Sequence, residues 1–354
     1  MSHYYSMGEY LKEKYKETAR PFSFRADNKE DWEQWKHQFT EKLYELLGEW
    51  PAKIVDPRPL VLEKVRYEGY VCEKVMIHSE ANMQVPFYFL IPDSDNPKAV
   101  ARSRNGKLPA VLCLHGHGGG KDDVADIQHG ERLREVDYKS HNYHMAPALA
   151  REGYIAIVPD ARGFGERKLG YGKPHAGGEK DGCDLVFLKS IMLGINPLTL
   201  NIWDAMRCVD YLESRDEVDS ERIGCIGLSF GGAWALYTSI LDNRIRTAVI
   251  SGYFNSFESH AIQWGNFCGS MTIPNLLKYG EMADLAALLA PKPVLLTSGK
   301  HDIGFPYEAS EQAYETVKRA YAAAGCEERT KFDGFDGGHQ FNVPTTLDWL
   351  NQWL

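Results

Sequence analysis

Short apolar segments alternate with amphipathic segments along most of this 354-residue chain, and this alternation constrains its fold more than any other feature. A strand buried in a parallel sheet reads as a continuous apolar, β-branched run, because helices cover both of its faces. Such runs occupy residues 109–116, 154–160, 222–228, 247–252 and 293–299. Helical patterns lie at residues 144–151, 200–215, 230–241 and 309–325. We therefore predict an α/β fold with a mostly parallel central sheet and helices on both faces.

The segments outside this alternation predict the remaining organisation. Residues 1–55 are charged and rich in helix formers, so we expect an N-terminal helical extension before a single large domain at 56–354. Period-two patterns near the start of that domain predict antiparallel strands. The connections at about 161–199 and 253–290 are too long for simple turns, and both follow carboxyl ends of strands, where open α/β sheets bind ligands. We expect the second to form a cap-like insertion.

Composition narrows the partners and the compartment. The net charge of −9 argues against a nucleic-acid or anionic-membrane partner, because both require a basic face. The seven cysteines show no CxxC spacing, which favours a reducing compartment without a disulfide framework. The first residues lack the apolar core of a signal peptide, and no stretch approaches the roughly 18 apolar residues of a membrane span. We therefore expect a cytoplasmic protein.

The most informative motif is Gly227-Leu228-Ser229-Phe230-Gly231, a G-x-S-x-G between an apolar run and an Ala-rich helical pattern. A serine on a sharp strand-to-helix turn takes a strained conformation that holds its hydroxyl above the sheet edge. Glycines two residues to either side let the strand and the helix approach closely. This context predicts Ser229 as a nucleophile, although a tight glycine turn with an idle serine stays open.

A serine hydroxyl is a weak nucleophile, so it needs a base, and the base needs an acid that fixes its tautomer. On this architecture the chain order is Ser, Asp or Glu, then His. Asp302 follows the run at 293–299, and His339 lies in a glycine loop after the next strand pattern. Asp333 and Asp336 are rival acids, but they lie on the loop of His339 itself, so we rank them below Asp302.

HGHGGG, residues 115–120, begins at the end of the apolar run at 109–116 and predicts part of an oxyanion hole. The carbonyl oxygen that becomes negative in acyl transfer is stabilised by the N–H after the nucleophile and by an N–H from this loop. These are the backbone N–H groups of Phe230 and His117. A phosphate loop fails because Asp122 follows Lys121 where Ser or Thr is required.

Two pairs of histidines are possible metal ligands. His115 and His117 form an H-x-H pair, but no further ligand follows at a usual spacing. His141 and His144 lie at a predicted helix start and are more simply read as a polar cap region. A metal-dependent hydrolase therefore stays an alternative, and we expect neither a metal nor a cofactor.

The segments LHGHGGG, PDARGFGER, GLSFGGAWA, PKPVLLTSGKHDIGFP and GGHQF together resemble the α/β-hydrolase superfamily. Within it, the chain is similar to the serine esterases of the dienelactone-hydrolase and acetyl-xylan-esterase/cephalosporin-deacetylase-like families. The resemblance covers roughly residues 60–354. It implies Ser229 as nucleophile, Asp302 as acid and His339 as base. It also implies the oxyanion hole given above and a structural, bracing role for Arg162.

We therefore expect a cofactor-free serine hydrolase that cleaves small-molecule carboxylic esters, of the carboxylesterase or deacetylase type, through an acyl-enzyme intermediate. Tyr253, Trp264 and Phe267 of the second long connection are candidate walls of the substrate pocket, although these aromatics could instead pack the insertion onto the core. A lactone hydrolase, a serine peptidase and a non-catalytic protein on the same fold stay open. A homo-oligomer is compatible with the sequence.

Overall fold

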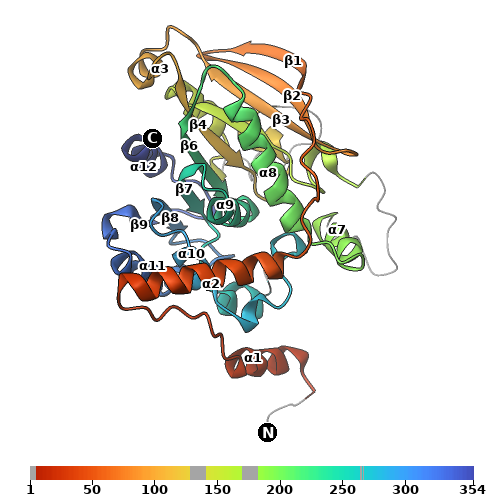
Figure 1. The fold of residues 1–354 in the computed structure, drawn as a ribbon, viewed down its shortest axis with the longest axis vertical. Helices are drawn as coiled ribbons and strands as arrows, with labels where there is room; N and C mark the ends of the chain where they lie inside the picture. Colours follow the sequence, from red (N-terminus) through yellow and green to blue (C-terminus); the bar gives the residue numbers. More distant parts are fainter. Residues whose placement is uncertain (1–4, 128–140, 170–181, 264, 266) are drawn as a thin grey trace.

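The computed structural model describes residues 5–127, 141–169, 182–263, 265 and 267–354, and its centre is one mixed sheet. Among these residues the sheet has nine strands in the order β1-β2-β3-β5-β4-β6-β7-β8-β9 (Figure 1). The strands are β1 Leu60–Tyr67, β2 Tyr70–Glu80, β3 Met83–Pro92, β4 Leu108–Leu114, β5 Ile155–Pro159, β6 Val218–Leu228, β7 Ile245–Ser251, β8 Val294–Gly299 and β9 Thr330–Phe335.

Strand pairing divides the sheet into two parts. β1, β2 and β3 pair antiparallel, and β3 joins β5 in the same sense. From β5 to β9 every pairing is parallel, with Leu112 opposite Ile157 of β5 and Cys225 of β6. The expected antiparallel start and parallel centre are both confirmed.

The side-chain period of the central strands divides the core into two layers. In β4, Ala110, Leu112 and Leu114 enter one hydrophobic cluster, whereas Val111 and Cys113 enter the other. Successive side chains of a strand point to opposite faces, so each cluster lies on one face of the sheet. The first cluster contains residues of α2, α8, α9, α10 and α11, and the second contains residues of α4, α6 and α12.

Most of the helices lie in the connections between successive strands. Their bounds are α1 Met7–Glu17, α2 Lys29–Leu47, α3 Pro97–Arg102, α4 Lys121–Ala125, α6 Met145–Arg151, α7 Gly182–Ile191, α8 Pro197–Glu213, α9 Phe230–Leu241, α10 Met282–Ala287, α11 Tyr307–Ala323 and α12 Val343–Trp353. α8 begins three residues before the predicted start at 200. Its N-cap Asn196 accepts a hydrogen bond from the Leu198 N–H, and Pro197 supplies the fixed φ favoured at the first helical position.

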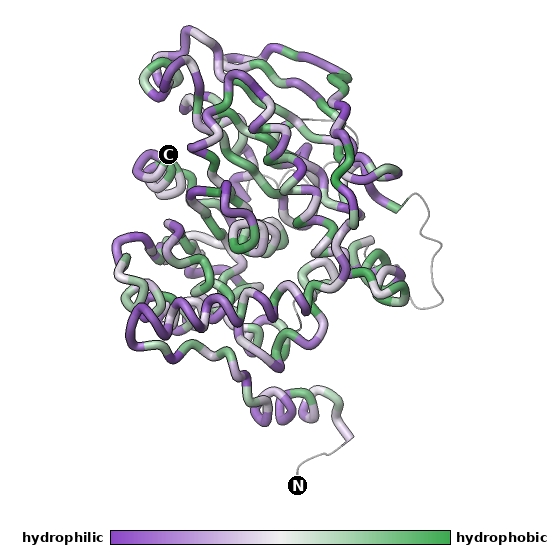
Figure 2. The backbone as a smooth tube through the Cα atoms, viewed as in Figure 1, coloured by the Kyte–Doolittle hydropathy of each residue, from purple (hydrophilic) through white to green (hydrophobic). Residues whose placement is uncertain are grey.

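The two N-terminal helices differ in how they join the core. α2 buries Trp32, Phe39, Leu43 and Leu47 in the first cluster. Most of its other residues are hydrophilic (Figure 2). α1 buries no residue and lies at the periphery of the fold beside the N-terminus (Figure 1). Within the described residues, no helix has both the length and the apolar character needed to cross a membrane.

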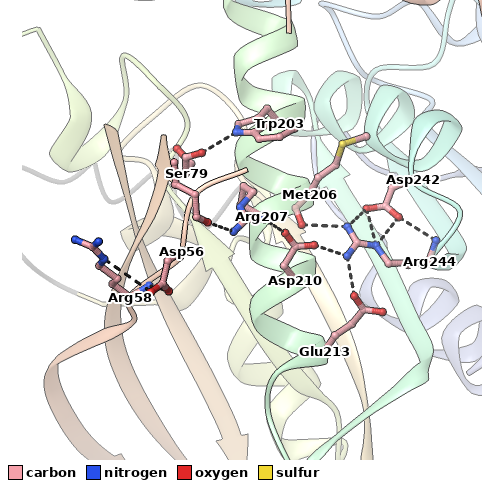
Figure 3. A network of polar contacts seen from close by, with 11 residues as sticks. Asp56, Arg58, Ser79, Trp203, Met206, Arg207, Asp210, Glu213, Asp242 and Arg244 are labelled. Carbon is pink, nitrogen blue, oxygen red and sulfur yellow. Dashed lines mark hydrogen bonds and ion pairs between the residues drawn. The ribbon is translucent and has the colours of Figure 1, made fainter. Parts of the chain in front are cut away.

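A polar network fixes α8 to its neighbours (Figure 3). Asp210 pairs with both Arg207 of the same helix and Arg244 of the turn before β7. Arg244 also contacts Asp242 at 2.7 Å, and Arg207 donates to the Val55 carbonyl at 2.8 Å. The network therefore ties one helix to segments far away in the sequence.

Arg162, three residues after β5, contacts the middle of the same helix. Its guanidinium contacts Asp204 of α8 at 2.8 Å and Glu80 of β2 at 2.6 Å. Arg167 reaches the same Asp204 carboxylate at 2.8 Å. Burial alone would raise the pKa of Asp204, but the two guanidinium groups hold it below its ordinary value. This arrangement agrees with the structural role that the resemblance implied for Arg162.

Removing the Asp204 charge leaves two partly buried arginines, Arg162 and Arg167, without their shared partner. Breaking a buried ion pair typically costs about 3–5 kcal/mol. We expect Asp204→Asn to lower the free energy of unfolding by about 3 kcal/mol, measured by urea denaturation. The control is Glu221→Gln, which removes an exposed partner of Arg246 and is expected to change stability by under about 1 kcal/mol. Equal stability of the two variants would contradict the role of Asp204.

Candidate functional site

The site lies where the strand order reverses. β5 lies on one side of β4 and β6 on the other, so the loops after β4 and β6 diverge at the carboxyl ends of the strands. A pocket of about 860 Å³ occupies this position. Both long connections and the loops after β4, β6, β8 and β9 contribute to its lining, including His117, Phe164, Cys183, Ser229, Phe267, Cys268, Asp302 and His339.

Ser229 occupies the predicted turn between β6 and α9. Its φ of 61° and ψ of −124° lie in a region that L-residues rarely adopt. A Cβ atom on Gly227 would lie 2.0 Å from the Gly231 carbonyl oxygen, and one on Gly231 would lie 2.1 Å from the Leu114 carbonyl oxygen. The Ser229 N–H donates to the Ser251 carbonyl at 2.9 Å, which fixes the turn to β7. Glycine is therefore required at both flanking positions.

Asp302 and His339 meet as predicted. His339 Nδ1 lies 2.7 Å from Asp302 Oδ2. The other carboxylate oxygen accepts the Gly304 N–H at 2.8 Å and the Phe305 N–H at 3.0 Å. An ionised carboxylate only accepts, so Nδ1 carries the proton and Nε2 of the neutral ring is left as an acceptor. This is the tautomer that a general base requires.

The rival acids have other partners. Asp336 pairs with His301 at 2.7 Å, and both side chains are exposed. Asp333 accepts from Asn342 Nδ2 at 2.7 Å. Neither lines the pocket. The geometry therefore favours Asp302 as the acid.

Two further rings hold the imidazole of His339. Phe305 stacks on it with centroids 5.5 Å apart and an interplanar angle of 9°. His141 meets it edge-on at 5.6 Å and stacks on Tyr143. His144 is the N-cap residue of α6, as expected of a cap region, whereas His141 lines the pocket. The sequence pattern placed His141 in the cap region with His144 and did not predict its place beside His339, because only packing brings these two loops together.

The two histidines of HGHGGG separate in the structure. The buried His115 ring uses both of its nitrogen atoms: Nε2 accepts the Ala161 N–H at 3.0 Å, and Nδ1 therefore donates to the Gly116 carbonyl at 2.7 Å. Burial lowers the pKa of His115, which favours this neutral form. His115 is thus a structural residue, and the H-x-H pair does not act as a pair of metal ligands.

The backbone N–H groups of His117 and Phe230 have no hydrogen-bond acceptor in the part of the chain that the structure describes. His117 lines the pocket, and Phe230 is the first residue of α9, directly after Ser229. The side chain of Phe230 stacks on Phe164 at 5.0 Å and is fully buried. Any role of Phe230 at the pocket is therefore carried by its backbone.

The structure gives a different result for each of the three residues that were predicted to line the pocket. Phe267 lines the pocket. Tyr253 does not: its side chain is fully buried in the core, where its ring contacts His260 and Phe305, so that prediction is wrong. The sequence shows that this residue is aromatic but not which side of the insertion it faces. Trp264 lies outside the described residues.

Three potential metal-ligating side chains gather on one wall of the pocket. The donor atoms of His117, Cys183 and Cys268 lie within 4.8 Å of one another. A hydrogen bond from Cys268 and contact with His117 lower the pKa of Cys183 below its ordinary value. All seven cysteines of the chain are free thiols.

Comparison with known proteins places this geometry in context. The profile of a family described as "Abhydrolase family" matches residues 2–341. "Putative hydrolase YtaP" of Bacillus subtilis (strain 168) is 27% identical over 312 residues, which cover 84% of this chain and 92% of that protein.

Solved structures share the fold. A "putative acetyl xylan esterase" from Bacteroides fragilis NCTC 9343 aligns with a TM-score of 0.75 at 22% identity, covering 94% of this chain and 83% of its own. "Methylesterase BT1017" aligns with a TM-score of 0.68 at 19% identity, covering 98% of this chain and 67% of its own. The sheet and its helices therefore recur over almost the whole chain.

The second long connection contains a buried histidine that should make the protein acid-sensitive. Burial lowers the pKa of His260 to about 4, and its Nε2 has no partner in the described part of the chain. The folded pKa lies below the ordinary value of 6.5, so this stability is present above pH 6.5 and is lost as the pH falls toward 4. At pH 5 the loss is about 2 kcal/mol.

We expect His260→Asn, whose amide can replace Nδ1 as a donor to the Ser256 carbonyl, to remove this share of the acid sensitivity. The measurement is the free energy of unfolding at pH 7.5 and pH 5. The exposed His37→Asn variant serves as control and should keep the wild-type dependence. An unchanged pH dependence in His260→Asn would exclude His260 as the source.

Proposed function

The chain belongs to the Abhydrolase family, and on that premise we propose that it is a serine-dependent hydrolase of carboxylic esters that works through an acyl-enzyme intermediate. The observation that carries the proposal is the 2.7 Å contact between His339 Nδ1 and Asp302 Oδ2, in the same pocket as the strained Ser229. A serine, a histidine of the right tautomer and a buried acid are the three groups that nucleophilic acyl transfer requires.

In the proposed reaction, Nε2 of His339 takes the proton of the Ser229 hydroxyl as the oxygen attacks the ester carbonyl. Asp302 keeps the imidazole oriented and stabilises the imidazolium that forms. The imidazolium then protonates the leaving alcohol, and the ester bond breaks. Water, deprotonated by the same nitrogen, cleaves the acyl-enzyme and regenerates Ser229.

The negative charge on the carbonyl oxygen needs fixed donors. We assign this role to the backbone N–H groups of His117 and Phe230, because both lack an acceptor among the described residues and both belong to the loops that meet at the pocket. The N-terminus of α9 adds the positive end of a helix dipole. Loss of one such donor typically costs about 10²–10³-fold in rate.

The names of the similar solved structures, an acetyl xylan esterase and a methylesterase, favour an ester over an amide as substrate. The pocket of about 860 Å³ is large enough for a drug-sized or sugar-sized molecule. A lactone is an internal ester and fits the same chemistry, so lactone hydrolysis is the second candidate.

A covalent probe tests whether Ser229 is the nucleophile. We expect a fluorophosphonate probe to form one adduct, on Ser229, located by mass spectrometry. Ser229→Ala and His339→Ala should give no adduct and lose at least about 10³-fold in turnover of p-nitrophenyl acetate. Ser298→Ala, which changes another buried serine, is the control and should retain the adduct. Absence of an adduct in folded wild-type protein would favour the non-catalytic alternative.

A matched pair of variants tests whether Asp302 is the acid. Asp302→Asn preserves shape but presents an amide to His339 and favours the wrong tautomer, which typically lowers kcat by about 10⁴-fold. We expect that loss for Asp302→Asn and less than about a twofold change for Asp336→Asn, since Asp336 pairs with His301 outside the pocket. The reverse order, measured with the same ester, would move the acid to the loop of His339.

A further inference from the structure

A group of three side chains on the pocket wall takes no part in the proposed acyl transfer, in which His117 contributes only its backbone N–H. These are the side chains of His117, Cys183 and Cys268, whose potential ligand atoms, one from each residue, all lie within 4.8 Å of one another. His117 Nε2 is 2.9 Å from Cys268 Sγ. The three residues come from different parts of the chain: the loop after β4, the start of α7, and the segment before the 3-10 turn Gly269–Met271.

The surrounding structure holds these side chains in place. The His117 ring packs against Phe164 and Phe230, with centroids 5.6 Å away in each case. The Gly269 N–H donates to Asp184 Oδ1 at 2.7 Å, so the residues that follow the two cysteines are joined directly. A ligand that needs this arrangement would not have to assemble it from distant loops.

Two thiols and one imidazole together favour a particular class of metal ion. Thiolate sulfur is a soft ligand and selects thiophilic metals, and imidazole suits Zn²⁺ as well. Tetrahedral Zn²⁺ has bonds of about 2.3 Å to sulfur and about 2.0 Å to nitrogen, which separate its donor atoms by roughly 3.5–3.8 Å. The donors of this cluster lie within 4.8 Å of one another, so small side-chain movements would bring them to that spacing.

We propose that His117, Cys183 and Cys268 form a binding site for one thiophilic divalent cation of the Zn²⁺ type. Three protein ligands leave a fourth position of a tetrahedral ion, and all three residues line the pocket, so that position faces the pocket that contains Ser229. The site is separate from the Ser229, Asp302 and His339 group and does not depend on the proposed ester hydrolysis.

The spacing along the sequence conceals this site. His117 and Cys268 are 151 residues apart, and the neighbouring histidine of the H-x-H motif, His115, uses both ring nitrogens within the core. A search for ligands by local spacing therefore pairs His117 with the wrong residue.

The test uses the full chain, reduced and freed of metal with a chelator. We expect it to bind one Zn²⁺ per chain in competition with a chromophoric chelator. Co²⁺ in place of Zn²⁺ should give the charge-transfer absorption of cobalt–thiolate bonds, which reports cysteine ligation without any measurement of activity. Cys183→Ser and Cys268→Ser should each weaken Zn²⁺ binding by more than about 100-fold, beyond the usual effect of losing an outer-shell partner.

Two variants serve as controls. Cys326→Ser removes a buried thiol elsewhere and should bind Zn²⁺ as the wild type does. Ser229→Ala should also keep wild-type Zn²⁺ affinity while losing ester turnover, which separates the failure of either proposal from the other. Near-UV circular dichroism establishes that each variant is folded.

Three results would overturn the proposal. The first is folded wild-type protein that takes up no Zn²⁺ and gives no cobalt–thiolate absorption. The second is wild-type affinity in folded Cys183→Ser or Cys268→Ser. The third is a Cys183–Cys268 disulfide that forms on oxidation while the reduced protein binds no metal, since the pair would then be a redox couple.

Discussion

The turn between β6 and α9 is the constraint on which the rest of the site depends. Ser229 has a φ of 61°, and the backbone of Gly231 passes so close to Leu114 that no Cβ atom fits between them. The turn therefore holds β4, β6 and α9 in one spacing. That spacing in turn determines where the loop of His117 lies, and with it one wall of the pocket. Strain of this kind persists only where packing on all sides determines it, and here the sheet and both hydrophobic clusters supply that packing.

Two buried carboxylates, those of Asp302 and Asp204, have partners on both of their oxygen atoms. Both oxygens of Asp302 are occupied, one by two backbone N–H groups and the other by His339. In α8, Asp204 is fully buried and is shared by Arg162 and Arg167. A complete set of donors fixes the orientation of each carboxylate. At Asp204 the two guanidinium groups also hold the pKa below its ordinary value. The His339 ring in the pocket and the two arginines beside α8 are thus each held by a carboxylate with no unused oxygen.

The parts of the site that could be predicted are those that depend on local backbone chemistry. The apolar runs predicted an α/β fold, and the resemblance of five segments, among them the one around Ser229, implied the α/β-hydrolase fold, which the family match and the structural likeness confirm. The contact between Asp302 and His339 could be predicted because each follows a strand, and carboxyl ends of parallel strands share one edge of the sheet. Tyr253 was wrongly predicted to line the pocket, because an aromatic ring in an insertion carries no local signal of the side to which it turns. His141 was assigned to a polar cap region, because nothing local shows that its loop packs against His339.

The sequence by itself determined the alternation of strands and helices, the serine turn and the order of the three groups around it, since these follow from short-range periodicity and from residue types with special backbone conformations. Only the tertiary structure decided which apolar residues of the long connections face the pocket, which ring packs on His339, and that His117 lies against Cys183 and Cys268 rather than acting with His115. Those contacts join segments far apart in the sequence, and their geometry depends on how whole elements pack across the sheet.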